Sequence, residues 1–140
     1  MDKVAPLGPV YQAGTLSGNP LAVAAGLAML RGLGSGDAYD RLEALGDRLE
    51  RGIQEVSVER SSQIQINRVG SMLTMFFADR PITDFDSAKS CDTGHFRRFF
   101  QTMLEHGVYW PPSQFEVAFV STAHTEADID QTIEAIGESL

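Results

Sequence analysis

The apolar residues of this 140-residue chain change their spacing near residue 63, and this change limits the folds that the chain can adopt. Between residues 42 and 56 they recur every three or four positions, which is typical of a helix with one buried face. From Gln63 they alternate with polar residues, and after Gly70-Ser71 a more apolar run covers Met72–Phe77. This pattern predicts a strand, a turn and a more buried strand that follow an amphipathic helix.

The segment that begins at Asn19-Pro20 predicts another helix. Asn is a favoured N-cap and Pro a favoured first helical residue, so we expect a helix over residues 21–31. Its many alanine and glycine residues permit close approach of another backbone, and they predict packing on more than one face. The first nineteen residues are rich in Pro and Gly, which is typical of an extended, irregular arm.

Capping residues set the limits of the later elements. Asp37 is expected to cap the helix over residues 42–56, and a third helix is expected from about Asp92 to His106, with Gly107 as its stop. Its inward residues are expected to be Phe96, Phe99, Phe100, Met103 and Leu104. Short strands are expected over residues 108–110 and 117–120. Thr125 and Asp128 resemble a capping box that opens a final helix from Glu126 to about Glu138.

The order of these elements predicts an α+β fold, in which helices cover a small, mostly antiparallel sheet. The charge balance of 11 Lys and Arg against 19 Asp and Glu gives a net charge of −8, which disfavours nucleic acid and anionic membrane surfaces as partners. No apolar stretch reaches the roughly 20 residues that a membrane helix needs. A single cysteine excludes an internal disulfide and favours a reducing, intracellular compartment, and no zinc-ligand spacing is present.

Isolated reactive side chains predict no catalytic site by themselves. His124 precedes a helix, but a structural or surface role is the better interpretation, and the same holds for His95 and His106. Cys91 is interpreted as an unreactive buried or surface thiol.

Two segments combine groups that a ligand would need. Glycines and hydroxyls in residues 11–20 precede a helix N-terminus, where N–H and hydroxyl donors can hold a phosphate; a plain helix start is the alternative. Residues 111–116 form a proline-stiffened loop that places Glu116 among aromatic residues. That carboxylate could position an amine-bearing substrate, or it could be a solvated loop acid.

These two segments, the small-residue helix after Pro20 and the helix start at residues 121–130 together resemble the C-terminal part of the glutamate-1-semialdehyde 2,1-aminomutase family. That family lies within the class III aminotransferase-like, fold type I pyridoxal phosphate proteins. The resemblance implies the conversion of glutamate 1-semialdehyde to 5-aminolevulinate in tetrapyrrole biosynthesis, with pyridoxal 5′-phosphate and pyridoxamine 5′-phosphate as the cofactor forms. The chain is then expected to be a C-terminal fragment that is inactive alone.

The resemblance also implies roles for particular residues. Gly14 and Thr15 would contact the cofactor phosphate of the neighbouring subunit in a homodimer, and Glu116 would be the active-site glutamate for a small-molecule substrate. Ser113 and Gln114 would support Glu116. Neither Lys3 nor Lys89 lies in the motif of the Schiff-base lysine, so no catalytic residue is expected within the chain, and no metal site is expected. Trp110-Pro111 departs from the smaller or aliphatic residues usual in the family.

The expected organisation is an interface and cofactor-phosphate arm at residues 1–19, a connecting helix at 20–35 and a small domain at 36–140. The expected location is the cytoplasm, or the plastid stroma in a plant or alga. Two alternatives stay open: a fragment of another class III aminotransferase acting on an ω-amine, and a stand-alone α+β interaction module. The apolar segment 21–29 predicts self-association of the isolated chain.

Overall fold

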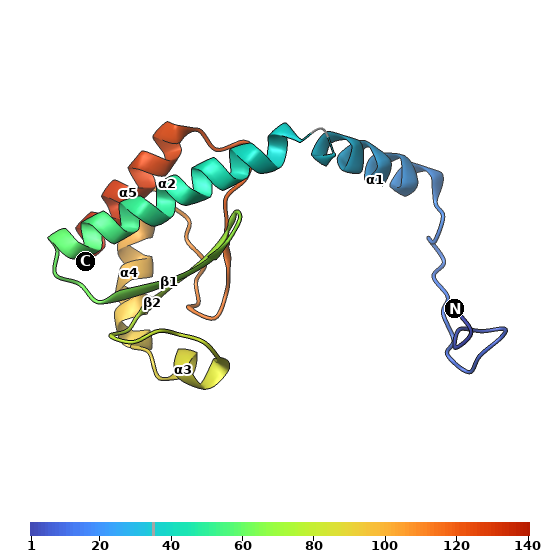
Figure 1. The fold of residues 1–140 in the computed structure, drawn as a ribbon, viewed down its shortest axis with the longest axis horizontal. Coiled ribbons are helices and arrows are strands. Elements are labelled where there is room, and N and C mark those ends of the chain that lie inside the picture. The colour runs from blue at the N-terminus through green and yellow to red at the C-terminus, as the bar shows by residue number, and fades with distance from the viewer. Residues whose placement is uncertain (35) are drawn as a thin grey trace. The chain divides into compact units, whose positions relative to one another are not determined.

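The computed structural model describes residues 1–34 and 36–140, which form two compact units, Met1–Gly36 and Asp37–Leu140. In the first unit an irregular arm leads into helix α1, Pro20–Leu33 (Figure 1). Asn19 is its N-cap, with Oδ1 accepting a hydrogen bond from Ala22 N at 3.1 Å, so the predicted helix start is confirmed. No helix among the described residues is long and apolar enough to cross a membrane.

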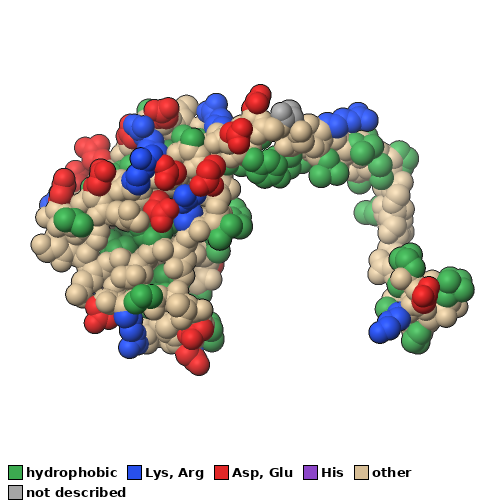
Figure 2. All heavy atoms as spheres, viewed as in Figure 1, with side chains coloured by type: hydrophobic (Ala, Val, Ile, Leu, Met, Phe, Trp, Pro, Cys, Tyr) green, Lys and Arg blue, Asp and Glu red, His purple; other side chains and the backbone are tan. Residues whose placement is uncertain are grey.

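The packing predicted for α1 is not found within the described residues of the first unit. None of its residues is buried, and hydrophobic side chains lie exposed along the helix, as Figure 2 shows. Leu21 is 80% exposed and Leu30 67% exposed. The small residues of α1 permit close packing, but no other element among the described residues of the first unit covers them.

The second unit contains the predicted α+β fold (Figure 1). Its elements, in chain order, are α2 (Asp37–Glu59), β1 (Ile64–Val69), β2 (Met72–Phe77), α3 (Phe85–Lys89), α4 (Thr93–Glu105), β3 (Ala118–Phe119) and α5 (Glu126–Ser139). The strands form an antiparallel sheet in the order β1-β2-β3. Ile64 pairs with Phe77 and Met72 with Phe119, so the predicted hairpin and the predicted sheet type are both confirmed.

The main core lies between one face of the sheet and helices α2, α4 and α5. Alternate residues of β2 point toward it, as the two-residue period of a strand requires. Phe96, Phe99 and Met103 of α4 are buried, as predicted. The prediction for Leu104 is wrong, because this side chain is 43% exposed, while Phe100 is partly buried against the core.

Helix α3 was not anticipated from the sequence. It is a single short helix that opens with a capping box, in which Asp84 Oδ1 accepts from Ser87 N at 2.7 Å and Ser87 Oγ accepts from Asp84 N at 3.1 Å. A second apolar cluster joins α3 to the opposite face of the sheet. Its buried members are Phe76, Ile82, Ala88 and Cys91. The sheet is therefore covered on both faces at this end.

Three other predictions need correction. Residues 108–110 form no strand, because the N–H of Trp110 donates to the nearby carbonyl of Val108 instead of to a neighbouring strand. The strand expected over 117–120 is limited to Ala118–Phe119. Asp37 is the first residue of α2 rather than its cap. The predicted limits of α4 are confirmed, with Asp92 as its N-cap, His106 as its C-cap and Gly107 at φ +77°. The Thr125–Asp128 capping box of α5 is confirmed as well.

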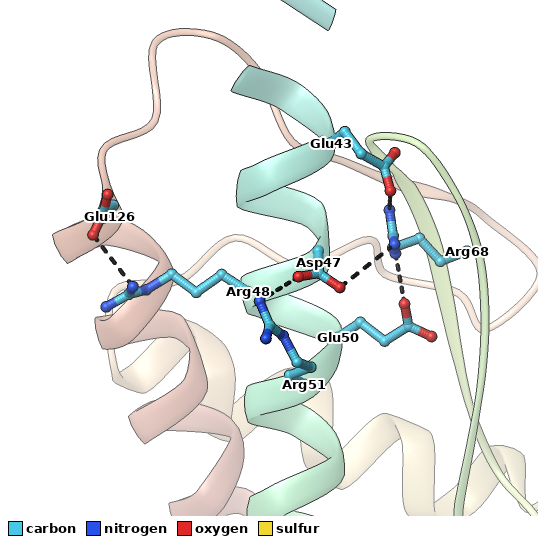
Figure 3. Close-up of polar contacts among 7 residues, drawn as sticks. All are labelled: Glu43, Asp47, Arg48, Glu50, Arg51, Arg68 and Glu126. Carbon is cyan, nitrogen blue, oxygen red and sulfur yellow. Dashed lines mark hydrogen bonds and ion pairs between the residues drawn. The ribbon is translucent and has the colours of Figure 1, made fainter. Parts of the chain in front are cut away.

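Two arginines join the polar face of α2 to neighbouring elements of the second unit (Figure 3). The side chain of Arg68 on β1 is 13% exposed. Its Nε lies 2.6 Å from Glu50 Oε2, and its Nη1 lies 2.9 Å from Glu43 Oε1. The hydrogen bond to Glu50 raises the pKa of the Arg68 guanidinium. Arg48 binds both carboxylate oxygens of Asp130 on α5, at 2.7 and 2.8 Å. Such two-point contacts fix direction as well as distance.

We expect the second unit to lose stability in acid, in part through Asp128. Hydrogen bonds from the backbone and hydroxyl of Thr125 lower the pKa of this carboxyl. A carboxyl with a lowered folded pKa stabilises the fold above its unfolded pKa of about 3.9, and this contribution is lost as the pH falls through the folded pKa. Melting temperatures measured between about pH 6 and pH 2 should therefore fall less steeply for Asp128→Asn than for the parent chain. Parallel curves would contradict this role.

Candidate functional site

The arm of the first unit forms a tight turn just before α1. The N–H of Ser17 donates to Gly14 O at 2.9 Å, and the N–H of Asn19 donates to Leu16 O at 3.0 Å. A Cβ at position 14 would lie 2.6 Å from Ser17 Oγ, so a larger residue there would have to displace the Ser17 hydroxyl. The Thr15 side chain is exposed, and its hydroxyl has no hydrogen-bond partner among the described residues. The turn thus leaves a hydroxyl donor available four residues before the N-cap of α1, whose N-terminus is the positive end of the helix dipole.

The loop between α4 and β3 carries the other candidate residues. Ser113 closes it locally: Ser113 Oγ accepts from Phe115 N at 3.2 Å, and Ser113 O accepts from Glu116 N at 3.1 Å. Trp110 anchors the beginning of the loop, because its ring is 5% exposed and meets Phe99 edge-on with 5.8 Å between the ring centroids. The buried indole and the two following prolines limit the freedom of the loop.

Glu116 lines a largely apolar cavity of about 360 Å³ within the second unit. The walls come from α2, β2, the α4–β3 loop and α5, and they include Leu49, Leu73, Tyr109, Trp110, Ile129 and Thr132. Glu116 is exposed, and its carboxylate has no ion-pair partner among the residues that the structure describes. An unpaired carboxylate at the edge of an apolar cavity attracts a cationic group and repels an anionic one.

The predicted residues fall into two groups. Gly14 and Thr15 belong to the first unit, whereas Ser113, Gln114 and Glu116 share one loop of the second unit. Gln114 does not line the cavity at Glu116; its side chain is 2% exposed and donates from Nε2 to Ala88 O at 3.0 Å. The sequence indicated Glu116 but not the cavity walls, whose only signal was the apolar spacing of core residues.

The isolated reactive residues take structural positions. His124 Nδ1 accepts from Ser121 N at 3.0 Å, although His124 also borders the Glu116 cavity. The His95 ring stacks on the ring of Phe77, with 3.9 Å between the ring centroids. Cys91 is buried, and burial raises the pKa of its thiol, so the thiolate that reacts with electrophiles is disfavoured. Among the described residues, no three His, Cys, Asp or Glu side chains come together as metal ligands.

The family model for class-III aminotransferases matches residues 1–140. The chain belongs to the class-III aminotransferase family. Among its relatives, a glutamate-1-semialdehyde 2,1-aminomutase of Thermus thermophilus is 59% identical over the whole chain, which covers 33% of that protein. A protein of the same name from Anaeromyxobacter dehalogenans is 58% identical over 96% of the chain and 31% of its own length. The chain thus spans about a third of these curated relatives.

Solved structures of class-III aminotransferases and their relatives share the fold. A glutamate-1-semialdehyde-aminomutase from Pseudomonas aeruginosa, in complex with PMP, matches with a TM-score of 0.81 at 22% identity, over 94% of this chain and 30% of that one. A β-phenylalanine aminotransferase from Variovorax paradoxus matches with a TM-score of 0.79 at 26% identity, over 94% and 30% of the two chains. The α+β unit and its arm are therefore a recurring part of this fold.

Proposed function

We propose that this chain is part of a glutamate-1-semialdehyde 2,1-aminomutase, which converts glutamate 1-semialdehyde to 5-aminolevulinate. One observation carries the proposal: two relatives of that name are 58–59% identical to this chain over 96–100% of its length. The shared fold alone assigns no substrate. Glu116 in its apolar cavity supports the proposal, because the substrate of this reaction carries an amine.

We propose further that the enzyme binds pyridoxal phosphate and pyridoxamine phosphate. The chemistry of the arm fits a phosphate: a Cβ at Gly14 would displace the Ser17 hydroxyl, and the Thr15 hydroxyl is exposed and unpartnered within the described residues. Thr15 and backbone N–H groups of the turn would hold the phosphate, beside the start of α1. When bound, the cofactor supplies the electron-accepting ring and the exchangeable amino group.

The two units would serve different parts of that site. We propose that the arm contributes Thr15 to the cofactor site of a second copy in a homodimer, so that a complete site needs two subunits. Glu116 would hold the amine end of the substrate and repel carboxylates, which gives specificity by attraction and repulsion together. The chain has two lysines, Lys3 and Lys89, and Lys89 pairs with Asp86 at 2.8 Å. We assign covalent attachment of the cofactor to neither.

The test of this function uses the longest open reading frame that contains these codons, expressed beside the 140-residue chain alone. The long protein should form 5-aminolevulinate from glutamate 1-semialdehyde, and the short chain should not. Transamination of ordinary amino donors and keto acids, without 5-aminolevulinate formation, would instead support an aminotransferase acting on an ω-amine. 5-Aminolevulinate formation by the short chain would overturn the proposed division of the site.

In the long protein, Glu116→Gln is expected to lower kcat/KM for glutamate 1-semialdehyde by about tenfold. The amide keeps the size of the side chain but loses the charge that strengthens its bond to an amine. It should also relax the exclusion of α-carboxylates, measured as a rise in transamination of ordinary α-amino acids. Glu105→Gln, at an exposed position of α4, is the matched control and should retain the parent values on both substrates.

Thr15→Val is expected to weaken retention of the cofactor phosphate by about tenfold, because it removes one hydrogen bond to a charged group without changing the side-chain shape. Cofactor occupancy after extensive dialysis measures the effect. Thr15→Ser should retain most of the cofactor, since it keeps the hydroxyl. Thr102→Val on α4 is the control, since its hydroxyl donates to Arg98 O within its own helix. Equal occupancy in all variants would remove Thr15 from the phosphate site.

A further inference from the structure

The Glu116 loop is attached to helix α3 by a contact that lies outside the cavity. Gln114 Nε2 donates to Ala88 O at 3.0 Å, across 26 positions in the sequence, and the Gln114 side chain is fully buried. Next to it, the ring of Phe115 meets the ring of Phe85 with 6.0 Å between centroids. Two consecutive residues of the loop therefore touch α3, one by a buried hydrogen bond and one by an aromatic contact.

Helix α3 is itself held firmly enough to serve as an anchor. Its capping box fixes its first turn through Asp84 and Ser87, and Ala88 is 8% exposed within the second apolar cluster. Asn67 of β1 adds a further link, because its Nδ2 donates to Ile82 O at 2.9 Å just before the helix. The carbonyl that accepts the hydrogen bond from Gln114 thus belongs to a segment with two links to the sheet, namely the second apolar cluster and the hydrogen bond from Asn67.

The loop is also held at both of its ends, by the buried Trp110 and by the pairing of Ala118 with Leu73 in the sheet. Glu116 N donates to Ser113 O within the same turn, and Thr74 Oγ1 approaches Glu116 O at the long distance of 3.5 Å. Gln114 lies two residues before Glu116, so its hydrogen bond sets where the turn sits relative to the sheet. A buried hydrogen bond resists exchange with water and defines a direction more strictly than an exposed one.

We propose that Gln114 is a positioning residue that holds Glu116 in place for the amine of the substrate, through its bond to Ala88 and without touching the substrate. This inference rests on the proposed function. In this inference the second apolar cluster and α3 support the Glu116 loop. Displacement of a binding group by about 1 Å can reduce the rate a hundredfold, so a loosened loop should have a measurable effect.

The substitution Gln114→Met tests the bond with little risk of unfolding the protein. Gln114 Oε1 is buried and has no partner among the described residues. A methionine of similar size removes the donor and this unpartnered acceptor together, so the loss of one bond is offset by the loss of one buried, unsatisfied group. The melting temperature should stay close to that of the parent, and Gln101→Met on the exposed face of α4 is the matched control.

In the long protein, Gln114→Met is expected to lower kcat/KM for glutamate 1-semialdehyde by about tenfold and to speed hydrogen exchange in residues 113–117. In a Glu116→Gln background, Gln114→Met should lower kcat/KM by less than about twofold, because Gln114 acts through Glu116. Gln101→Met should alter neither quantity.

The outcomes separate this inference from the proposed function. If the parent protein does not form 5-aminolevulinate, the proposed function fails, and the exchange of residues 113–117 still decides whether Gln114 holds the loop. Unchanged exchange in Gln114→Met would overturn the anchoring. Faster exchange with parental kcat/KM, or an equal loss in both backgrounds, would overturn the action through Glu116.

Discussion

Replacing Phe99 with alanine is expected to lower the free energy of unfolding of the second unit by about 3–5 kcal/mol, the usual cost of deleting a fully buried aromatic side chain. Phe99 is 0% exposed, and its ring meets those of Phe77 and Phe96 with 5.6 Å between centroids in each pair. These neighbours come from β2 and from α4 itself, so the helix and the sheet can close the resulting cavity only in part. Urea denaturation followed by circular dichroism measures the loss.

The same substitution should also affect the candidate site. Phe99 supports Trp110, which forms part of the wall of the Glu116 cavity. We therefore expect tryptophan fluorescence to shift toward that of an exposed indole before the global transition, since Trp110 is the single tryptophan of the chain. Phe119→Ala is the matched control: this ring is 66% exposed, and its loss should cost about 1 kcal/mol or less. Equal losses for the two variants would contradict the observed core.

The second large effect is expected at the crossing of α2 and α5. Gly52 is buried on α2. A Cβ at this position would lie only 2.7 Å from Cγ1 of Ile133 on α5. Gly52→Ala should therefore force the two helices apart or move Ile133 from its rotamer, at a cost of about 1–3 kcal/mol. This cost exceeds the gain of up to about 1 kcal/mol that alanine brings to a helix interior. The midpoint of urea denaturation should fall.

A double-mutant cycle identifies the cause. In an Ile133→Ala background the added methyl group has space, so Gly52→Ala should become neutral or stabilising. Gly137→Ala provides a control at the same helix pair, because a Cβ at Gly137 would make ordinary contact with Val56 Cγ1 at 3.6 Å. That variant should be at least as stable as the parent. A similar loss in both backgrounds of the cycle would show that steric contact with Ile133 is not the cause.

Local features of the fold could be predicted because the groups that determine them are close in sequence. Asn19-Pro20, Asp92 and the Thr125–Asp128 pair begin their helices as expected, since each satisfies N–H groups within one turn. The hairpin followed from the two-residue apolar period and its Gly70-Ser71 turn. The prediction for Leu104 was wrong because its burial depends on residues far away in sequence. Apolar spacing shows which face of a helix is apolar, but the elements packed against the helix decide how much of that face is buried.

The candidate site was predicted less completely than the fold. Gly14, Thr15 and Glu116 were named from local motifs, and the structure leaves the Thr15 and Glu116 side chains exposed, as ligand-binding groups would need to be. The roles of these residues stay predictions. The cavity beside Glu116 could not be predicted, because Leu49, Leu73 and Ile129 come from three elements whose packing no local pattern specifies.

The sequence by itself determined the periods of the helices and strands, their capped ends, the α+β class and the resemblance that led to the family. Only the tertiary structure decided that the polar face of α2 binds Arg68, that α3 lies beneath the Glu116 loop, and that Gln114 is buried against Ala88. The reason is physical. Capping and periodicity depend on residues within a few positions of one another, whereas these contacts join residues 18 to 26 positions apart and form only once the core has packed.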